Sequence, residues 1–175
     1  MQFLVSLLFS LVMTTTQLGF SPPLSEAPGS WKWPLPTVGN NSAHAFLTPV
    51  ILEPFDPPEF KWSAGHRGID LGGTEGTAVT APASGRVSFQ GTVVDRPVLS
   101  IDHGDGYVSS FEPLESTLQK GDAVTQGQVI GTIATGGHCT ARCIHWGVRF
   151  HDEYVDPMLF IVDTRPSILL PWTDN

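Results

Sequence analysis

The sequence is poor in basic residues. Its 175 residues include nine Lys and Arg against 17 Asp and Glu, which gives a formal net charge of −8. Nucleic-acid binding releases counterions at a positively charged surface, and the basic residues here form no cluster. We therefore expect no nucleic-acid partner.

Long hydrophobic runs are also lacking. The N-terminal apolar run from Phe3 to Met13 has about the length of a secretory signal core and is too short to span a bilayer. We expect a signal peptide over residues 1–19, a flexible leader over 20–30, one domain over 31–165 and a tail over 166–175. The mature protein would be exported and would have no stable membrane span.

Cysteine is scarce as well. The two cysteines, Cys139 and Cys143, lie four positions apart. In an exported protein such a pair predicts a local disulfide, and so small a loop serves to shape one segment more than to stabilise the whole fold.

No segment shows sustained helical periodicity, and the strongest helix start is Asp156-Pro157, followed by a turn or two at most. A proline-rich segment from Trp31 to Pro58 should wrap the domain with its aromatic residues packed inward: Trp31, Trp33, Phe46 and Phe55. From residue 77 onward, short runs rich in Val, Ile and Thr alternate with turn residues, which predicts strands at 77–81, 85–89, 97–102, 107–112, 128–134 and 144–150. The fold class is all-β, a compact antiparallel sheet of barrel or sandwich type with little helix.

Two histidines and an aspartate are the candidate metal ligands. Gly65-His66-Arg-Gly68-Ile-Asp70 lies near the middle of the chain, and His145 follows on a predicted strand. Imidazole nitrogens with one carboxylate oxygen suit Zn²⁺, and three protein ligands leave a position for water, as in catalytic sites. The chain must bend between His66 and Asp70, and Gly68 is the expected position of that bend.

At these residues the chain resembles the lysostaphin-type (LytM-like) zinc peptidases, which act on peptide cross-bridges of bacterial peptidoglycan. The resemblance covers about Phe55 to Leu159 and is carried by five segments: 65–71, 79–87, 100–107, 120–131 and 144–146. It implies that His66, Asp70 and His145 bind one Zn²⁺ ion. It also implies a secreted, cell-wall-associated protein that binds peptidoglycan peptides.

Two other functional histidines of that family are not present. The first His of a His-x-His motif is Cys143 here, and a Tyr-x-His-Leu motif reads Phe111-Glu-Pro113-Leu. Two residues could replace them in proton transfer. Glu112 adjoins the altered position, although strand alternation would aim it at the opposite face unless Pro113 causes a bulge. His138 precedes the predicted disulfide, and Gly136-Gly137 could let its loop carry the imidazole over the metal.

These residues are compatible with three functions. The first is a zinc metalloendopeptidase that cleaves peptidoglycan peptides. The alternative is a non-catalytic zinc-binding wall protein that binds wall peptide or regulates another cell-wall hydrolase. A carrier domain for a lipoyl or biotinyl group is disfavoured, because no lysine lies at the tip of the relevant hairpin, 121–129.

Overall fold

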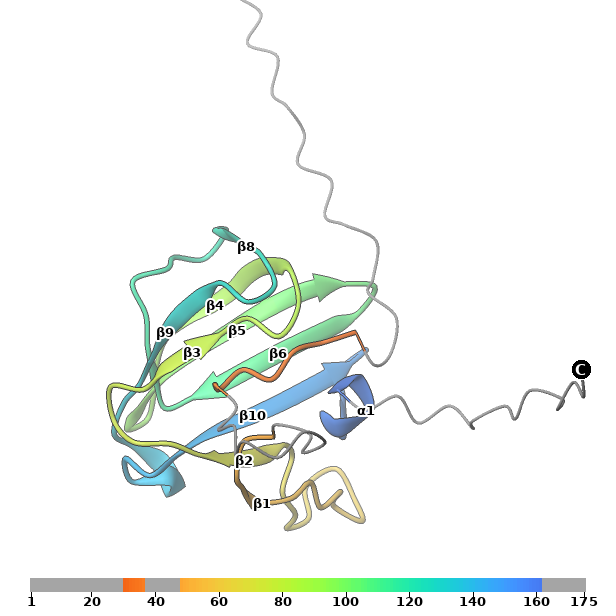
Figure 1. The fold of residues 1–175 in the computed structure, drawn as a ribbon. Helices are drawn as coiled ribbons and strands as arrows, with labels where there is room; N and C mark the ends of the chain where they lie inside the picture. Colours follow the sequence, from red (N-terminus) through yellow and green to blue (C-terminus); the bar gives the residue numbers. More distant parts are fainter. Residues whose placement is uncertain (1–29, 37–47, 162–175) are drawn as a thin grey trace, which may run out of the picture.

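Two antiparallel sheets form the body of the protein. The structure is a computed structural model and describes residues 30–36 and 48–161. The predicted signal peptide, nearly all of the leader, Phe46 and the tail lie outside the described residues. Figure 1 shows the larger sheet with the smaller one against it. The all-β prediction is confirmed.

The elements follow one another in this order: β1 (Ile51–Glu53), β2 (Ile69–Gly72), β3 (Ala78–Thr80), β4 (Gly85–Val93), β5 (Arg96–Gly104), β6 (Tyr107–Glu112), β7 (Leu114–Glu115), β8 (Ala123–Val124), β9 (Val129–Ile133), the 3₁₀ turn η1 (Gly137–Cys139), β10 (Cys143–Phe150), β11 (Glu153–Val155) and α1 (Met158–Ile161). The larger sheet has the order β1-β2-β10-β6-β5-β4-β8, with β11 also paired to β10. The smaller sheet has the order β3-β9-β7. In the larger sheet, β10 therefore lies between β2 and β6.

The strands form where apolar side chains alternate along the sequence. Each of the six predicted strands overlaps an observed one, and the prediction for 107–112 coincides with β6. The turn between β5 and β6 takes the left-handed conformation at Gly104, Asp105 and Gly106, as its sequence favours. The short strands β1, β2, β7, β8 and β11 were not predicted, because two to four residues give too little alternation to recognise.

The core lies between the two sheets. Its largest fully buried side chains come from both: Trp146, Phe111, Leu99, Ile101 and Ile144 from the larger sheet, and Leu114, Ile130, Ile133 and Val79 from the smaller one. The rings of Phe111 and Trp146 are stacked with centroids 6.5 Å apart. This packing makes β6 and β10 the rigid centre of the molecule.

The proline-rich segment packs inward as predicted for the part that the structure describes. Trp31 is buried, and Trp33 and Phe55 pack against the core. The Trp31 ring stacks on Phe160 of α1 at a centroid distance of 4.5 Å, and the Trp31 amide donates to the Phe160 carbonyl at 3.1 Å. The predicted helix start is also confirmed, since the Asp156 carboxylate accepts a hydrogen bond from the Met158 amide at 2.9 Å.

Within the described residues, no helix is both long and apolar enough to cross a bilayer.

One histidine is buried in the body of the fold, away from the candidate ligands. His103 is 6% exposed; its Nδ1 donates to the Ser84 carbonyl at 2.9 Å, and its Nε2 lies 2.8 Å from the Ser109 hydroxyl. Burial lowers the pKa of His103 to about 4, despite the opposing influence of the Ser84 carbonyl and of Asp102. His103 is therefore a neutral structural residue at pH 7.

The burial of His103 predicts a pH-dependent stability. The unfolded chain binds this proton near the ordinary pKa of about 6.5, whereas the folded chain binds it only near 4. The neutral, buried His103 therefore contributes fully to the free energy of unfolding above about pH 6.5. As the pH falls from there to 4, the free energy of unfolding decreases by about 3 kcal/mol. Urea unfolding at several pH values should show this loss in the wild type and a shallower one in His103→Gln. An equal decrease in the free energy of unfolding with falling pH in the two proteins would contradict the prediction.

Candidate metal centre

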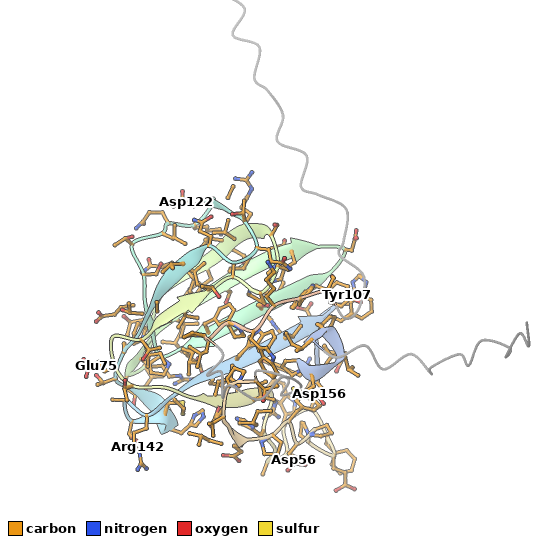
Figure 2. All side chains as sticks on the ribbon, viewed as in Figure 1. Asp56, Glu75, Tyr107, Asp122, Arg142 and Asp156 are labelled. Atoms are coloured by element: carbon orange, nitrogen blue, oxygen red, sulfur yellow. A yellow bond between two sulfur atoms is a disulfide. The ribbon has the colours of Figure 1, made fainter. Side chains whose placement is uncertain are left out.

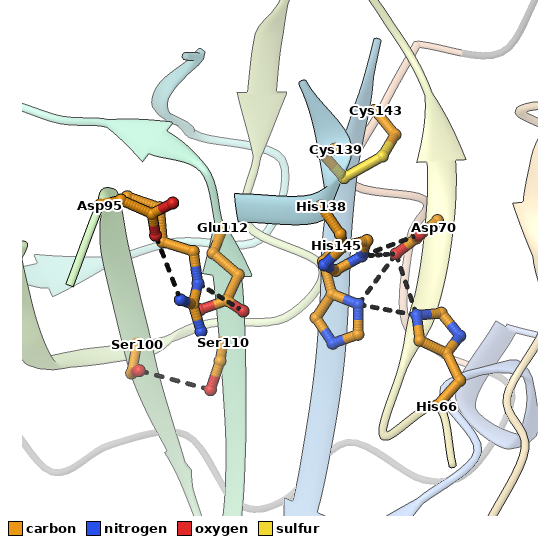
Figure 3. Close-up of polar contacts among 11 residues, drawn as sticks. His66, Asp70, Asp95, Ser100, Ser110, Glu112, His138, Cys139, Cys143 and His145 are labelled. Carbon is orange, nitrogen blue, oxygen red and sulfur yellow. Dashed lines mark hydrogen bonds and ion pairs between the residues drawn. A yellow bond between two sulfur atoms is a disulfide. The ribbon is translucent and has the colours of Figure 1, made fainter. Parts of the chain in front are cut away.

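Three segments bring together four side chains that could hold a metal ion. Asp70 lies on β2 and His145 lies directly opposite it on β10. His66 lies just before β2, where its backbone pairs with Asp56, and His138 lies in η1. Their donor atoms are all within 4.8 Å of one another. Figure 3 shows the four side chains converging from these elements.

The Asp70 carboxylate is at the centre of the cluster. Its Oδ1 lies 2.9 Å from His145 Nδ1 and 3.1 Å from His66 Nε2, while those two nitrogens are 3.0 Å apart. His138 Nε2 lies 3.1 Å from Oδ1 and 3.0 Å from Oδ2. The structure therefore brings the three predicted metal ligands together with His138, which the sequence suggested as a replacement base.

These four donors fit a zinc ion. His66 Nδ1 lies 2.8 Å from the Pro54 carbonyl, which can only accept, so Nδ1 carries the proton and Nε2 presents its lone pair to the cluster. Ligands bonded to zinc at 2.0–2.1 Å in a tetrahedron are about 3.3 Å apart, close to the separations seen here. Three imidazoles and a carboxylate are also chemically suited to Zn²⁺.

The electrostatics of Asp70 agree with a charged ligand. The residue is 3% exposed, and burial alone would raise the pKa of its carboxyl. Hydrogen bonds and charge from His145 and His138 outweigh that effect and lower the pKa below its ordinary value. Asp70 is therefore ionised and available to a cation at neutral pH.

Gly68 lies at the bend predicted between His66 and Asp70, and it is also needed for space. Its backbone is outside the left-handed region, so the requirement for glycine is steric. A Cβ at this position would lie 2.5 Å from the Trp146 carbonyl oxygen and 2.7 Å from His145 Nε2. Only glycine lets the segment between His66 and Asp70 pass this close to β10.

Glu112 lies on the same face of the sheet as His145. The two residues are direct partners in the β6–β10 pairing, and directly opposed side chains project from one face. The expectation that Glu112 would point to the opposite face is therefore wrong, because β6 keeps regular pairing through its last residue. Glu112 lines a cavity of about 580 Å³ with these residues: Glu53, Gly65, His66, Arg67, Arg96, Val98, Ser110, His138, His145, Gly147 and Tyr154.

An arginine that sequence reasoning missed holds Glu112 in this cavity. Arg96 Nε lies 3.0 Å from Glu112 Oε1, and Arg96 Nη1 lies 3.6 Å from Asp95. Hydrogen bonding to Glu112 raises the pKa of Arg96, against the opposing effect of burial. No local motif marks Arg96, since its partner is on the neighbouring strand.

The disulfide forms the other side of the centre. Cys139 and Cys143 are joined as predicted, with Cα atoms 4.9 Å apart. Their sulfurs are close to the Asp70 carboxylate. Cys143 is thus unable to act as a base or a proton donor, and Pro113, between β6 and β7, offers no titratable group.

Comparison with known proteins identifies the class to which this fold and donor set belong. The profile of peptidase family M23 matches residues 64–157, more than half of the chain. The chain therefore belongs to peptidase family M23, and the predicted lysostaphin-type resemblance is confirmed. It is a divergent member, because Pro113 and Cys143 replace two of the usual histidines.

Two relatives are similar to this chain over part of their own length. An uncharacterised protein of Mycobacterium tuberculosis is 37% identical over 129 residues, which cover 70% of this chain and 51% of that protein. The murein hydrolase activator NlpD of Salmonella typhimurium is 28% identical over 153 residues, which cover 85% of this chain and 36% of that protein. The chain thus spans about half the length of the first relative and about a third of the second.

Solved structures agree on the fold. The catalytic domain of the antimicrobial peptidase lysostaphin from Staphylococcus simulans matches with a TM-score of 0.57 and 24% identity, over 65% of this chain and 92% of that one. A zinc-containing peptidase from Vibrio cholerae matches with a TM-score of 0.61 and 20% identity, over 79% of this chain and 41% of that one.

The close approach at Gly68 predicts the effect of filling it. In Gly68→Ala the new methyl group would collide with the Trp146 carbonyl and the His145 ring, so the ligands should separate and zinc affinity should fall at least about 10-fold. Competition with a chromophoric chelator measures this affinity. Gly72→Ala is the matched control, since its methyl group would make only ordinary contacts from 3.5 Å. Equal affinities in the two variants would contradict the prediction.

Proposed function

We propose that this chain is a zinc-dependent peptidase of the cell envelope that cleaves peptide bonds in peptidoglycan peptides. The observation that carries the proposal is the convergence of His66, Asp70 and His145, since both of these histidines line a cavity that also contains the carboxylate of Glu112. A zinc ion held by these three residues would polarise the scissile carbonyl and acidify a water molecule.

Glu112 is the residue to which we assign proton transfer. It lies opposite His145 on the same face of the sheet and outside the donor cluster, so it faces the cavity without being a ligand. Its ion pair with Arg96 orients the carboxylate. A carboxylate in this position can accept the proton of the attacking water and deliver it to the leaving amine.

The domain boundaries and the location belong to the same proposal. A signal peptide over residues 1–19, a leader over 20–30, the domain over 31–165 and a tail over 166–175 would place the metal centre outside the cytoplasm, at the cell wall. The Cys139–Cys143 disulfide supports this location, because disulfides persist in oxidising compartments.

A second candidate function is favoured by Pro113 and Cys143. With both usual histidines replaced, the domain would bind wall peptide through its metal centre and regulate another hydrolase. The relative named murein hydrolase activator supports this alternative.

Amine release from purified peptidoglycan tests the peptidase. Zinc-loaded full-length or mature protein should generate new amino groups, and Glu112→Gln should reduce the rate by about 100-fold or more, as expected for loss of a general base. Glu115→Gln is the matched control, since Glu115 is exposed on β7 and does not line this cavity. His145→Ala should abolish both zinc binding and hydrolysis.

Two results would contradict this assignment. Equal rates for Glu112→Gln and Glu115→Gln would show that Glu112 does not transfer the proton. No amine release from the zinc-loaded wild type, together with stimulation of a separate wall hydrolase by this protein, would replace the peptidase with the regulatory function.

A further inference from the structure

We propose that His138 is a fourth protein ligand of the zinc ion and that it closes the metal centre in the resting protein. The inference rests on the proposed zinc site and concerns how that site is regulated. Three protein ligands would leave a position for water or substrate, whereas four would fill a tetrahedral site. The His138 imidazole would then have to leave the metal before substrate could bind there.

The geometry of the rings supports ligation by His138. Its Nε2 is as close to the Asp70 oxygens, at 3.0 and 3.1 Å, as the nitrogens of His66 and His145 are. The His138 ring is edge-on to both other imidazoles, with centroids 5.9 Å from His66 and 5.4 Å from His145. Rings that point their nitrogens at one centre adopt this arrangement, and stacked rings do not.

His138 occupies the solvent side of the cluster. Its side chain is 50% exposed, compared with 12% for His66 and His145 and 5% for Asp70. The other three donors are more deeply buried, so the His138 imidazole covers the side of the cluster that faces solvent. Ligation by His138 would therefore exclude exogenous ligands.

The η1 loop is held in this position from both ends. On one side, Gly136 and Gly137 lie against the β4–β5 turn: a Cβ on Gly137 would be 2.7 Å from Arg96 Cδ, and one on Gly136 would be 2.5 Å from the Asp95 carbonyl oxygen. On the other side, Cys139 is tied to Cys143 at the start of β10. These two attachments hold the loop that carries the His138 imidazole.

Counting imidazole ligands tests the proposal directly. Zinc K-edge X-ray absorption of the zinc-loaded full chain should show three imidazoles in the wild type and two in His138→Ala. His151→Ala is the matched control, because His151 is exposed and not among the clustered donors, and it should keep three. Two imidazoles in the wild type would overturn the proposal.

Whether His138 closes the metal site can be measured without following hydrolysis. In the cobalt-substituted protein, acetohydroxamate should leave the visible spectrum of the wild type unchanged and should shift that of His138→Ala, where the position is open. An equal shift in both proteins would overturn closure of the site.

A second variant keeps the test informative if His138→Ala folds poorly. Gly137→Ala retains the imidazole but collides with Arg96, so it should also lose the third imidazole and respond to acetohydroxamate. Gly127→Ala has a comparable positive φ of +80° without any neighbour within 4 Å, and it should behave as the wild type. If the wild type has three imidazole ligands but no protein in the series releases amines from peptidoglycan, the result supports His138 as a ligand and contradicts the peptidase function.

Discussion

The pairing of Asp70 on β2 with His145 on β10 is the constraint on which the metal centre depends. The two residues are 75 positions apart, and the antiparallel register brings the carboxylate within 2.9 Å of the imidazole. Side chains alternate between faces along a strand, so a slip of one residue would send Asp70 to the other side of the sheet. The packing of Trp146 against Phe111 fixes β10 and so protects this register.

The departures from the usual family pattern are connected in space. Cys143 occupies a position that normally carries an imidazole, and its disulfide ties down the loop that presents His138 to the same metal centre. Across the cavity, β6 ends with Glu112, whose partner Arg96 also supports the η1 loop. The positions of the two replaced histidines are thus accompanied by a second set of polar groups, Glu112, Arg96 and His138, which line one pocket.

Much of the fold was predictable, because long strands such as β6 and β10 carry the alternation of a half-buried sheet. The candidate metal ligands could be selected from the sequence because histidine and aspartate framed by glycine form a recognisable local pattern. The orientation of Glu112 and the partnership with Arg96 depend on the register between strands, which no local pattern encodes. Likewise, the steric requirement for glycine at position 68 depends on the close passage of β10, which the sequence around Gly68 does not encode.

The stacking of Trp31 on Phe160 has a consequence for how the domain can be joined to other sequences. It holds residues near both ends of the described body together, and Tyr107 connects them to Phe150, the last residue of β10. His145 lies five residues back along that strand, about 17 Å away. In Figure 2, Tyr107 and Arg142, which follows η1, lie at opposite sides of the body. The two ends of the described body therefore lie at the side away from η1, an arrangement suited to modular use.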